Sequence, residues 1–262
     1  MRKRLDQIVV ERGFFPTRSK AKQAIQAQLV LVESRIIDKP GLLIDESSNI
    51  SIIEDPEFSY VSRGGLKLQE ALNRFEVNAE GSVAIDVGAS TGGFTDCLLR
   101  HGARRVYAVD VGTDQLHPIL RQDPRVVVME QTNIRYLTPE SLPEQCSLAT
   151  VDVAFISLTK FFAVLLSLLT TDADIVTLIK PQFEVGPSAV SKGGIVRNLK
   201  IHKEMLVRVC TELQECGCSL RGLIKSPITG SDGNTEYLAH FKKGMEPIDC
   251  SNWVNKVIDR KE

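Results

Sequence analysis

The stretch from Val83 to Asp110 constrains the fold more than any other part of the chain. It opens with a short apolar run, 83–87, whose length and β-branched content are typical of a buried strand. A loop of small residues, 88–93, follows, then a segment with helical spacing, then a second apolar run that ends in Asp110. This order predicts a βαβ unit that holds a nucleotide-like ligand over the C-terminal ends of two parallel strands, with the acid placed for ribose hydroxyls.

The glycine loop differs from the dinucleotide fingerprint, because it lacks the full G-x-G-x-x-G order and no phosphate-binding Gly-Lys-Ser/Thr follows it. Its glycines let the backbone approach a ligand closely without demanding a pyrophosphate. An adenosine ligand without phosphates, such as S-adenosylmethionine (SAM), fits at least as well, and an ordinary βαβ turn is the alternative. The expected cofactor contacts come from the loop and from neighbouring strand ends: Gly88, Ala89, Ser90, Thr91, Gly92, Gly93, Phe94, Asp110, Asn133 and Asp152.

Length and composition limit the functions that the chain can have. Its 262 residues suffice for one large and one small domain, and the net charge of −1 means that any affinity for nucleic acid must come from local patches. The six cysteines show no metal-ligand spacing, so we expect reduced thiols in a cytoplasmic protein and no metal. No apolar run reaches the ~20 residues of a membrane span, so we expect no membrane partner.

The N-terminal region reads as a small, separate α/β domain. Two short helices, at 4–11 and 18–28, precede several short strands, and Thr17 has the position and chemistry of an N-cap. Between Met1 and Lys39 there are nine Lys and Arg against four Asp and Glu, a local excess of five positive charges. A cationic helix pair suits binding to a phosphate backbone, although a solvated surface has the same composition.

Several segments of this region resemble the S4 RNA-binding domain. They are Arg4-Leu5-Asp6, Val10-Glu11-Arg12-Gly13, Ser19-Lys20-Ala21, Val30-Leu31-Val32 and Lys39-Pro40-Gly41. In that family the two helices present basic residues to structured RNA. We expect RNA contacts by five basic side chains, four in this region and one just after it: Arg4, Arg18, Lys20, Lys22 and Arg63.

Strands and helices continue to alternate after Asp110, which predicts an α/β fold with a mostly parallel sheet and helices on both faces. Within this pattern we expect a helix at 115–120, a strand at 149–155 that contains Asp152, and a helix at 158–169. A carboxylate inside an apolar strand is costly unless it has a partner. Four ionisable residues lie at junctions of loops with strands or helices: Lys67, Asp152, Lys180 and Glu236.

The middle and C-terminal regions resemble the FtsJ-like 2′-O-ribose methyltransferases, and most closely the TlyA (hemolysin A) family, which joins an S4 domain to that enzyme. The segments that carry the resemblance are SRGGLKL, DVGASTGGFTDCLL, DVAFISL, IKPQFE and GNTEY. It implies a Rossmann-like SAM-dependent methyltransferase fold. We divide the chain into an S4-like domain at 1–57, a linker at 58–61, a methyltransferase domain at 62–245 and a C-terminal tail at 246–262.

The same resemblance gives the four ionisable residues catalytic roles. Lys180 would contact the ribose 2′-hydroxyl, either as a base, which requires a like charge such as Lys67 nearby, or as a charged group that stabilises the developing alkoxide. Asp152 and Glu236 would hold the two lysines, and Asp152 would also lie close to the methyl donor. The plainer alternative is a surface Lys67–Glu236 pair and a structural Asp152.

By resemblance, the substrate is a cytidine in ribosomal RNA of the ribosome or its subunits, with its base exposed or flipped to present the ribose. A non-catalytic ribosome-assembly factor that keeps SAM as a structural ligand is the second hypothesis. A membrane-lytic protein, as the hemolysin name suggests, is the third, although the sequence contains no basic amphipathic helix that supports it. The modified nucleotide, the subunit and the oligomeric state stay open.

Overall fold

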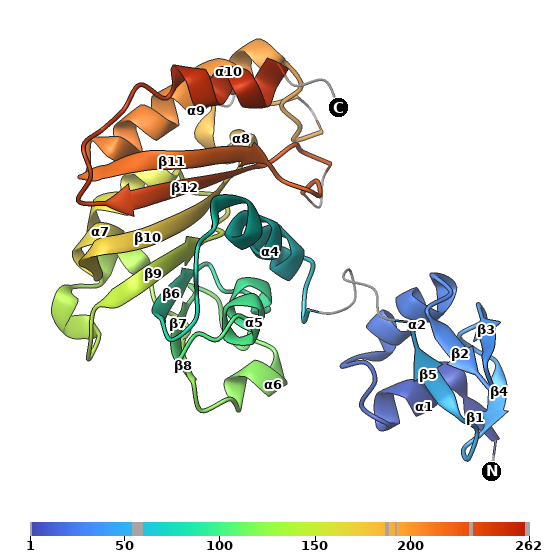
Figure 1. The fold of residues 1–262 in the computed structure, drawn as a ribbon. Coiled ribbons are helices and arrows are strands. Elements are labelled where there is room, and N and C mark those ends of the chain that lie inside the picture. Colours follow the sequence, from blue (N-terminus) through green and yellow to red (C-terminus); the bar gives the residue numbers. More distant parts are fainter. Residues whose placement is uncertain (1, 54–59, 187–188, 192, 231–232, 260–262) are drawn as a thin grey trace. The chain divides into compact units, whose positions relative to one another are not determined.

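The structure of this chain is a computed structural model that describes residues 2–53, 60–186, 189–191, 193–230 and 233–259. The chain divides into two compact units, Met1–Arg63 and Gly64–Glu262 (Figure 1). Most of the region around the expected linker at 58–61 lies outside the described residues, so the domain boundaries predicted from the sequence stay predictions.

The first unit combines two helices with short strands. A two-stranded sheet has the order β1-β4 and a three-stranded sheet has the order β3-β2-β5. The elements are β1 (Arg2–Arg4), α1 (Leu5–Glu11), α2 (Arg18–Gln26), β2 (Val30–Val32), β3 (Arg35–Ile37), β4 (Leu43–Asp45) and β5 (Ile50–Ile52).

Apolar side chains from both helices and the strands form the core of this unit. Leu5, Val9 and Ile25 are fully buried there, as the helical spacing of these residues predicts. The backbone N–H of Lys20 donates to Oγ1 of Thr17 over 3.2 Å, which confirms the expected N-cap of α2. The paired strands β1 and β4 were not expected from the sequence, because each has only three residues.

The second unit is built on a seven-stranded sheet, counted over the part of the chain that the structure describes. Its order is β11-β12-β10-β9-β6-β7-β8, and only β12 runs antiparallel to its neighbours. The strands are β6 (Val83–Val87), β7 (Arg105–Val109), β8 (Val126–Met129), β9 (Cys146–Val151), β10 (Leu169–Ile179), β11 (Cys218–Lys225) and β12 (Tyr237–Lys243). The predicted mostly parallel sheet is confirmed.

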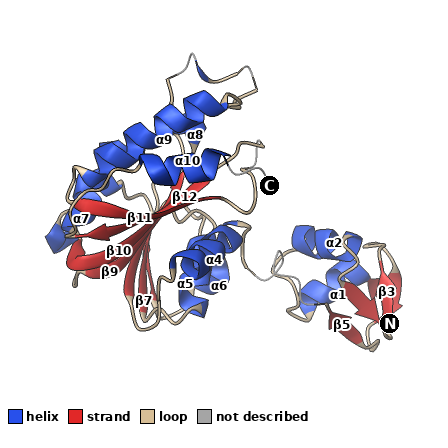
Figure 2. Ribbon diagram, turned by 45° about the horizontal axis from the view of Figure 1, so that its top comes forward, coloured by secondary structure: helices blue, strands red, loops and turns tan. Residues whose placement is uncertain are grey.

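Helices cover both faces of this sheet (Figure 2). On one side lie α4 (Gly64–Phe75) and α5 (Gly93–Arg100), and on the other lie α7 (Phe162–Ser167), α9 (Leu199–Gln214) and α10 (Ser251–Asp259). Shorter elements join them: α6 (Pro118–Arg121), α8 (Pro181–Glu184), η1 (Ile134–Tyr136), η2 (Pro139–Ser141) and η3 (Leu158–Lys160). Alternate residues of β6 pack into the larger core, which is the period-2 pattern of a strand buried on both faces.

The helix expected at 115–120 is wrong in extent, because only α6 forms. The backbone N–H groups of Asp114, Gln115 and Leu116 donate instead to the carboxylate of Glu130, at 2.9 to 3.0 Å. The segment before α6 is therefore a loop whose shape is set by one acid. Pro118 then occupies the first turn of the helix, where its missing N–H costs nothing.

Two further expectations need correction. The strand expected at 149–155 ends at Val151, so Asp152 follows β9 instead of lying inside it. The backbone N–H of Asp152 still bonds to the carbonyl of Val87 over 2.9 Å, and Phe155 then takes a positive φ of 64°, which no strand continues through. The helix expected at 158–169 is divided into η3 and α7, because Phe161 (φ −142°) leaves helical geometry between them.

One carboxyl group is buried at the centre of the sheet. Asp86 in β6 is 0% exposed and accepts hydrogen bonds from the hydroxyls of Thr95 in α5 (2.7 Å) and Thr150 in β9 (3.0 Å). Burial raises the pKa of Asp86 to about 7, and the two hydroxyl donors reduce the rise.

The Asp86→Asn variant tests this burial through the pH dependence of stability. Because the pKa of Asp86 is higher in the folded chain than the ordinary value of 3.8, the folded state holds its proton more tightly. The contribution of Asp86 to the free energy of unfolding therefore falls as the pH rises from about 4 to 7, by roughly 4 kcal/mol at most. The free energy of unfolding of Asp86→Asn minus that of the wild type should become more positive over that range in urea titrations. A difference that does not change with pH would contradict the assignment.

Candidate active site

The carboxyl ends of β6 and β9 lie side by side where the strand order of the sheet reverses. On one side of β6 the sheet continues with β7 and β8, and on its other side it continues with β9 and β10. Open α/β sheets hold ligands at such a switch point. Gly88, directly after β6, has φ +85°, and a Cβ there would lie 2.4 Å from the carbonyl oxygen of Asp152. Only glycine permits this approach of the two loops.

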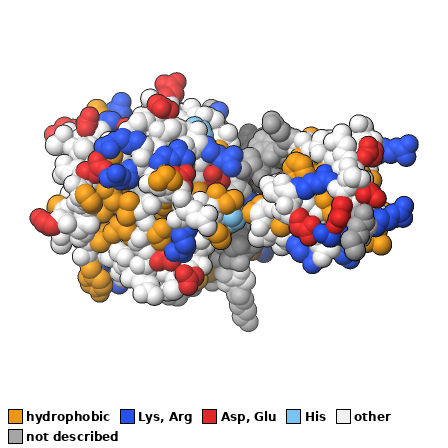
Figure 3. All heavy atoms as spheres, turned by 90° about the horizontal axis from the view of Figure 1, so that it is seen from below, with side chains coloured by type: hydrophobic (Ala, Val, Ile, Leu, Met, Phe, Trp, Pro, Cys, Tyr) orange, Lys and Arg blue, Asp and Glu red, His pale blue; other side chains and the backbone are white. Residues whose placement is uncertain are grey.

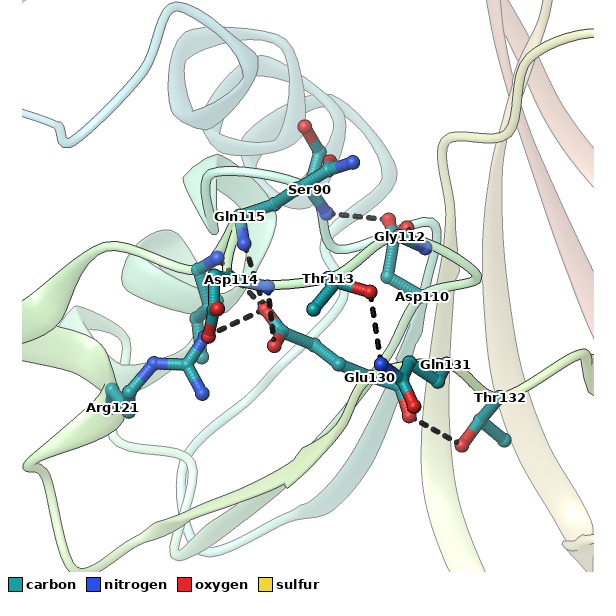
Figure 4. A network of polar contacts seen from close by, with 11 residues as sticks. Ser90, Asp110, Gly112, Thr113, Asp114, Gln115, Arg121, Glu130, Gln131 and Thr132 are labelled. Atoms are coloured by element: carbon teal, nitrogen blue, oxygen red, sulfur yellow. Dashed lines mark hydrogen bonds and ion pairs between the residues drawn. The ribbon is translucent and has the colours of Figure 1, made fainter.

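The loop 88–93 is closed onto the acid that ends β7. The backbone N–H of Ser90 donates to Oδ2 of Asp110 over 2.8 Å, and the N–H of Gly112 donates to Oδ1 over 2.7 Å (Figure 4). Ser90 and Thr91 are exposed at the loop surface, whereas Phe94 is 3% exposed and packs in the interior. Asp110 is thus fixed by two amides, and each of its oxygens keeps acceptor capacity for a ligand hydroxyl.

A second acid, Glu130, organises the neighbouring loop and was not singled out from the sequence. It accepts bonds from the three backbone N–H groups at 114–116 and from the guanidinium of Arg121 at 2.7 Å (Figure 4). The bond from Arg121, followed by the one from Leu116, lowers the pKa of Glu130 to about 2. Its position directly after an apolar strand was the available signal, but nothing in the sequence identified the donors.

Asn133 lies four residues beyond the end of β8 and caps η1. Its Oδ1 accepts a hydrogen bond from the backbone N–H of Arg135 over 3.1 Å. The side-chain oxygen of Asn133 is therefore used to cap η1.

The four ionisable residues singled out from the sequence form two close ion pairs in the second unit. Nζ of Lys67 lies 2.6 Å from Oε2 of Glu236, and Nζ of Lys180 lies 2.6 Å from Oδ1 of Asp152. Ile179 in β10 faces Tyr237 in β12, so Lys180 and Glu236 continue from paired positions at one edge of the sheet.

These side chains are largely shielded from water. The exposed fractions of the side chains are 3% for Glu236, 10% for Lys67, 16% for Lys180 and 22% for Asp152. Removing charges from water is costly, so each needs its partner. The Lys180–Asp152 contact has the distance of an ion pair without the angles of a hydrogen bond: Oδ1 of Asp152 is buried and makes no hydrogen bond within the described residues.

Local structure fixes Glu236 and Lys67. The backbone N–H of Ser226 donates to the carbonyl of Glu236 over 2.9 Å, which anchors the residue at the start of β12. A Cβ at Gly230 would lie 2.6 Å from Oε1 of Glu236, so the loop needs a glycine there. Lys67 is in the first turn of α4, which packs on β12.

An exposed aromatic side chain lies close in sequence to these pairs. Phe155 is 90% exposed and has a positive φ of 64°, an unusual conformation for a bulky residue. Its ring centroid lies 5.1 Å from that of Phe183. Phe155 comes three residues after Asp152, and Phe183 three residues after Lys180. Sequence reasoning counted Phe155 as part of a strand and missed its exposure.

The five basic residues expected to contact RNA all lie in the first unit. Arg4 and Arg18 share the carboxylate of Asp6, whereas Nζ of Lys20 donates to the carbonyl of Tyr60. The remaining two, Lys22 and Arg63, are exposed. On the face drawn in Figure 3, Lys and Arg side chains are interspersed with Asp and Glu side chains.

Two further features are absent from the described residues. No group of three or more His, Cys, Asp or Glu side chains has the arrangement of a metal site there. Among the helices that the structure describes, none combines the length and the apolar character needed to cross a membrane.

Known proteins share both units. The FtsJ-like methyltransferase family matches residues 60–243, and the S4 domain matches residues 3–50. YqxC of Bacillus subtilis, named as an rRNA methyltransferase, is 49% identical over 92% of this chain and 85% of its own length. The 16S/23S rRNA (cytidine-2′-O)-methyltransferase TlyA of Mycobacterium tuberculosis is 41% identical over 99% and 97%.

A solved structure agrees with these relatives. The structure of a protein from Streptococcus thermophilus that is named as a hemolysin is 42% identical, with a TM-score of 0.77 over 98% of this chain and 94% of the other. The resemblance noted in the sequence is confirmed: this chain belongs to the FtsJ-like methyltransferase family and, within it, to the TlyA proteins that join an S4 domain to the methyltransferase.

Proposed function

We propose that this protein transfers the methyl group of SAM to the ribose 2′-hydroxyl of a cytidine in ribosomal RNA. The observation that carries the proposal is the pair of shielded ion pairs, Lys67–Glu236 and Lys180–Asp152, at the carboxyl edge of a methyltransferase sheet. The substrate follows the names of relatives such as TlyA of Mycobacterium tuberculosis. Because ribosomal subunits are the substrate, the protein works in the cytoplasm.

The residues at the switch point fit SAM. The amide-fixed carboxylate of Asp110 suits the ribose hydroxyls, and the glycine loop at 88–93 lets the backbone approach the ligand closely. Asp152 follows β9 beside this loop, since a Cβ at Gly88 would lie 2.4 Å from its carbonyl oxygen, so it borders the same ligand position. When bound, SAM supplies an electrophilic methyl group on a sulfonium.

The chain's own residues position and activate the hydroxyl. In the proposal, Lys180 contacts the 2′-oxygen and Asp152 orients Lys180. Lys67 and Glu236 form the second pair, so that two ammonium and two carboxylate groups carry no net charge together. An in-line displacement gains much of its rate from such positioning. Shielding from water strengthens each of these interactions in the site.

Phe155 is our candidate for the residue that receives the base of the target nucleotide. A flipped cytosine needs a π-face to replace its stacking neighbours, and aromatic side chains provide one. The exposed ring of Phe155 is held in a strained backbone conformation close in sequence to Asp152. Strain at an exposed aromatic residue points to a task outside the core.

The Lys180→Ala variant tests the enzyme directly. We expect methyl transfer from labelled SAM to ribosomal subunits to fall by about 10²–10⁴-fold, because one transition-state contact is removed. SAM binding, measured by calorimetry, should change little. If Lys180→Ala keeps full activity in cells and in vitro, or if wild-type protein binds SAM and methylates neither subunit, the non-catalytic assembly factor is the better description.

Lys180→Arg separates the two roles considered for this residue. Arginine keeps the positive charge and does not accept a proton at any working pH. Retention of a substantial part of kcat would identify Lys180 as a charged stabiliser of the alkoxide. Loss as complete as in Lys180→Ala, with Lys180→Arg folded and binding SAM, would identify it as the base.

The Phe155→Ala variant tests base recognition. We expect kcat/KM for ribosomal subunits to fall by about 5–100-fold, since stacking on an aromatic side chain contributes ~1–3 kcal/mol per base. Stability should change by less than about 0.5 kcal/mol, because the ring is 90% exposed. Phe155→Tyr, which keeps the π-face, is the matched control and should retain most activity. Equal activity in Phe155→Ala and wild type would exclude the stacking role.

A further inference from the structure

A buried carboxylate in the first unit holds two of the arginines that were expected to bind RNA. The side chain of Asp6, in the first turn of α1, is 0% exposed. Arg4 binds it with two nitrogens, Nε to Oδ1 over 3.0 Å and Nη2 to Oδ2 over 3.1 Å. Arg18, from the first turn of α2, donates through Nη2 to Oδ2 over 3.0 Å.

The two guanidinium groups remain open to solvent on their other side. The exposed fractions of the side chains are 43% for Arg4 and 48% for Arg18. The side chain of Arg4 also packs on Gly41, where a Cβ would lie 3.2 Å from Nη1. A guanidinium has five N–H donors in a fixed plane, so the bonds to Asp6 fix the direction in which the remaining donors point.

Other basic residues of the unit are held differently. Lys3 pairs with the exposed carboxylates of Glu11 and Glu46, at 3.1 and 2.6 Å. The guanidinium of Arg12 donates to the backbone carbonyls of Ser48 and Glu46. Among the ion pairs of the described part of this unit, Asp6 is therefore the carboxylate that is fully buried.

Burying Asp6 costs free energy, and the two arginines offset that cost. The hydrogen bond from Arg4, followed by the one from Arg18, lowers the pKa of Asp6 against the opposing effect of burial. The cluster carries a net charge of +1, which suits one phosphate group. Bidentate donors fixed before binding lose less entropy on binding than free side chains do.

We propose that Asp6 is a positioning residue that orients Arg4 and Arg18 into one binding site for an RNA phosphate. The inference rests on the proposed function for the identity of the RNA, which is ribosomal. In this proposal, a negatively charged residue helps the protein to bind a negatively charged RNA. The carboxylate does not touch the RNA, because it is buried, and it acts only through the two guanidinium groups.

This role predicts an effect whose sign opposes simple electrostatics. Asp6→Asn removes one negative charge from an RNA-binding unit, so charge alone predicts tighter binding and a steeper salt dependence. If Asp6 orients the arginines, the variant instead binds ribosomal subunits more weakly, by roughly fivefold to tenfold, since two long side chains must be ordered on binding. Both Arg4 and Arg18 remain present in the variant, which makes the comparison specific to their orientation.

The matched control is Glu11→Gln, which removes the same charge from the same helix. Glu11 pairs with Lys3 at 3.1 Å, and its side chain is 55% exposed. Full-length wild type, Asp6→Asn and Glu11→Gln would be titrated against ribosomal subunits from cells that lack the protein, at two or more salt concentrations. Glu11→Gln should bind as well as wild type or slightly better. Binding by Asp6→Asn that equals or exceeds that of Glu11→Gln overturns the proposal.

Two further measurements guard against misfolding of Asp6→Asn. Asp6→Glu keeps the charge but moves the carboxylate by one methylene, and it should also weaken binding if orientation matters. In an Arg4→Gln/Arg18→Gln background, Asp6→Asn should have no further effect on binding. An undiminished effect in that background would show that Asp6 does not act through the arginines.

The kinetic readout keeps this proposal distinct from the proposed function. Asp6→Asn should raise KM for subunits and leave kcat unchanged, whereas a partly unfolded preparation lowers kcat at constant KM. If wild-type protein binds subunits but transfers no methyl group, the proposed function fails while the binding comparison still decides the role of Asp6. If Asp6→Asn binds as wild type in an active enzyme, only the inference about Asp6 fails.

Discussion

The site depends on the close approach of two backbone segments at the switch point of the sheet. Gly88 and Asp152 follow neighbouring parallel strands, and a single Cβ at position 88 would reach the carbonyl oxygen of Asp152. That approach places the glycine loop beside the Lys180–Asp152 pair. Every other feature of the site is arranged around it: β7 brings Asp110 to one side, and β10 brings Lys180 to the other.

Four shielded acids show how the surroundings of a carboxyl group set its role. Asp86 has uncharged donors, chiefly two hydroxyls, so burial dominates and raises its pKa. Glu130 has a guanidinium and three amides, so its pKa falls and it locks a loop. Asp6 is itself buried and binds two guanidinium groups that stay partly exposed. Glu236, 3% exposed, is matched with one lysine. The type of residue is similar in each case, and the donors differ.

The sequence predicts the strands well, because short β-branched apolar runs depend on local chemistry, and its motifs carry the resemblance to a methyltransferase. It fails where a distant side chain overrides a local pattern. The helix expected at 115–120 is reduced to α6, and the segment before it takes the shape of a loop whose amides bind Glu130, more than ten residues later. The strand expected to contain Asp152 ends before it, and the exposure of Phe155 could not be read from an apolar context.

The pairing of Lys67 with Glu236 is especially hard to predict from the sequence, since 169 residues separate the two. Residue types and motif order suggested that these groups belong together, but not which carboxylate faces which lysine. The strand register alone would suggest Glu236 for Lys180, because Ile179 pairs with Tyr237, but in the structure Glu236 binds Lys67 from α4 and Lys180 binds Asp152. Each ammonium therefore has its own carboxylate. An opposite charge favours the protonated form of an amine, so these pairs oppose a chemistry in which one lysine acts as a base and suit stabilisation of an alkoxide by a charged lysine.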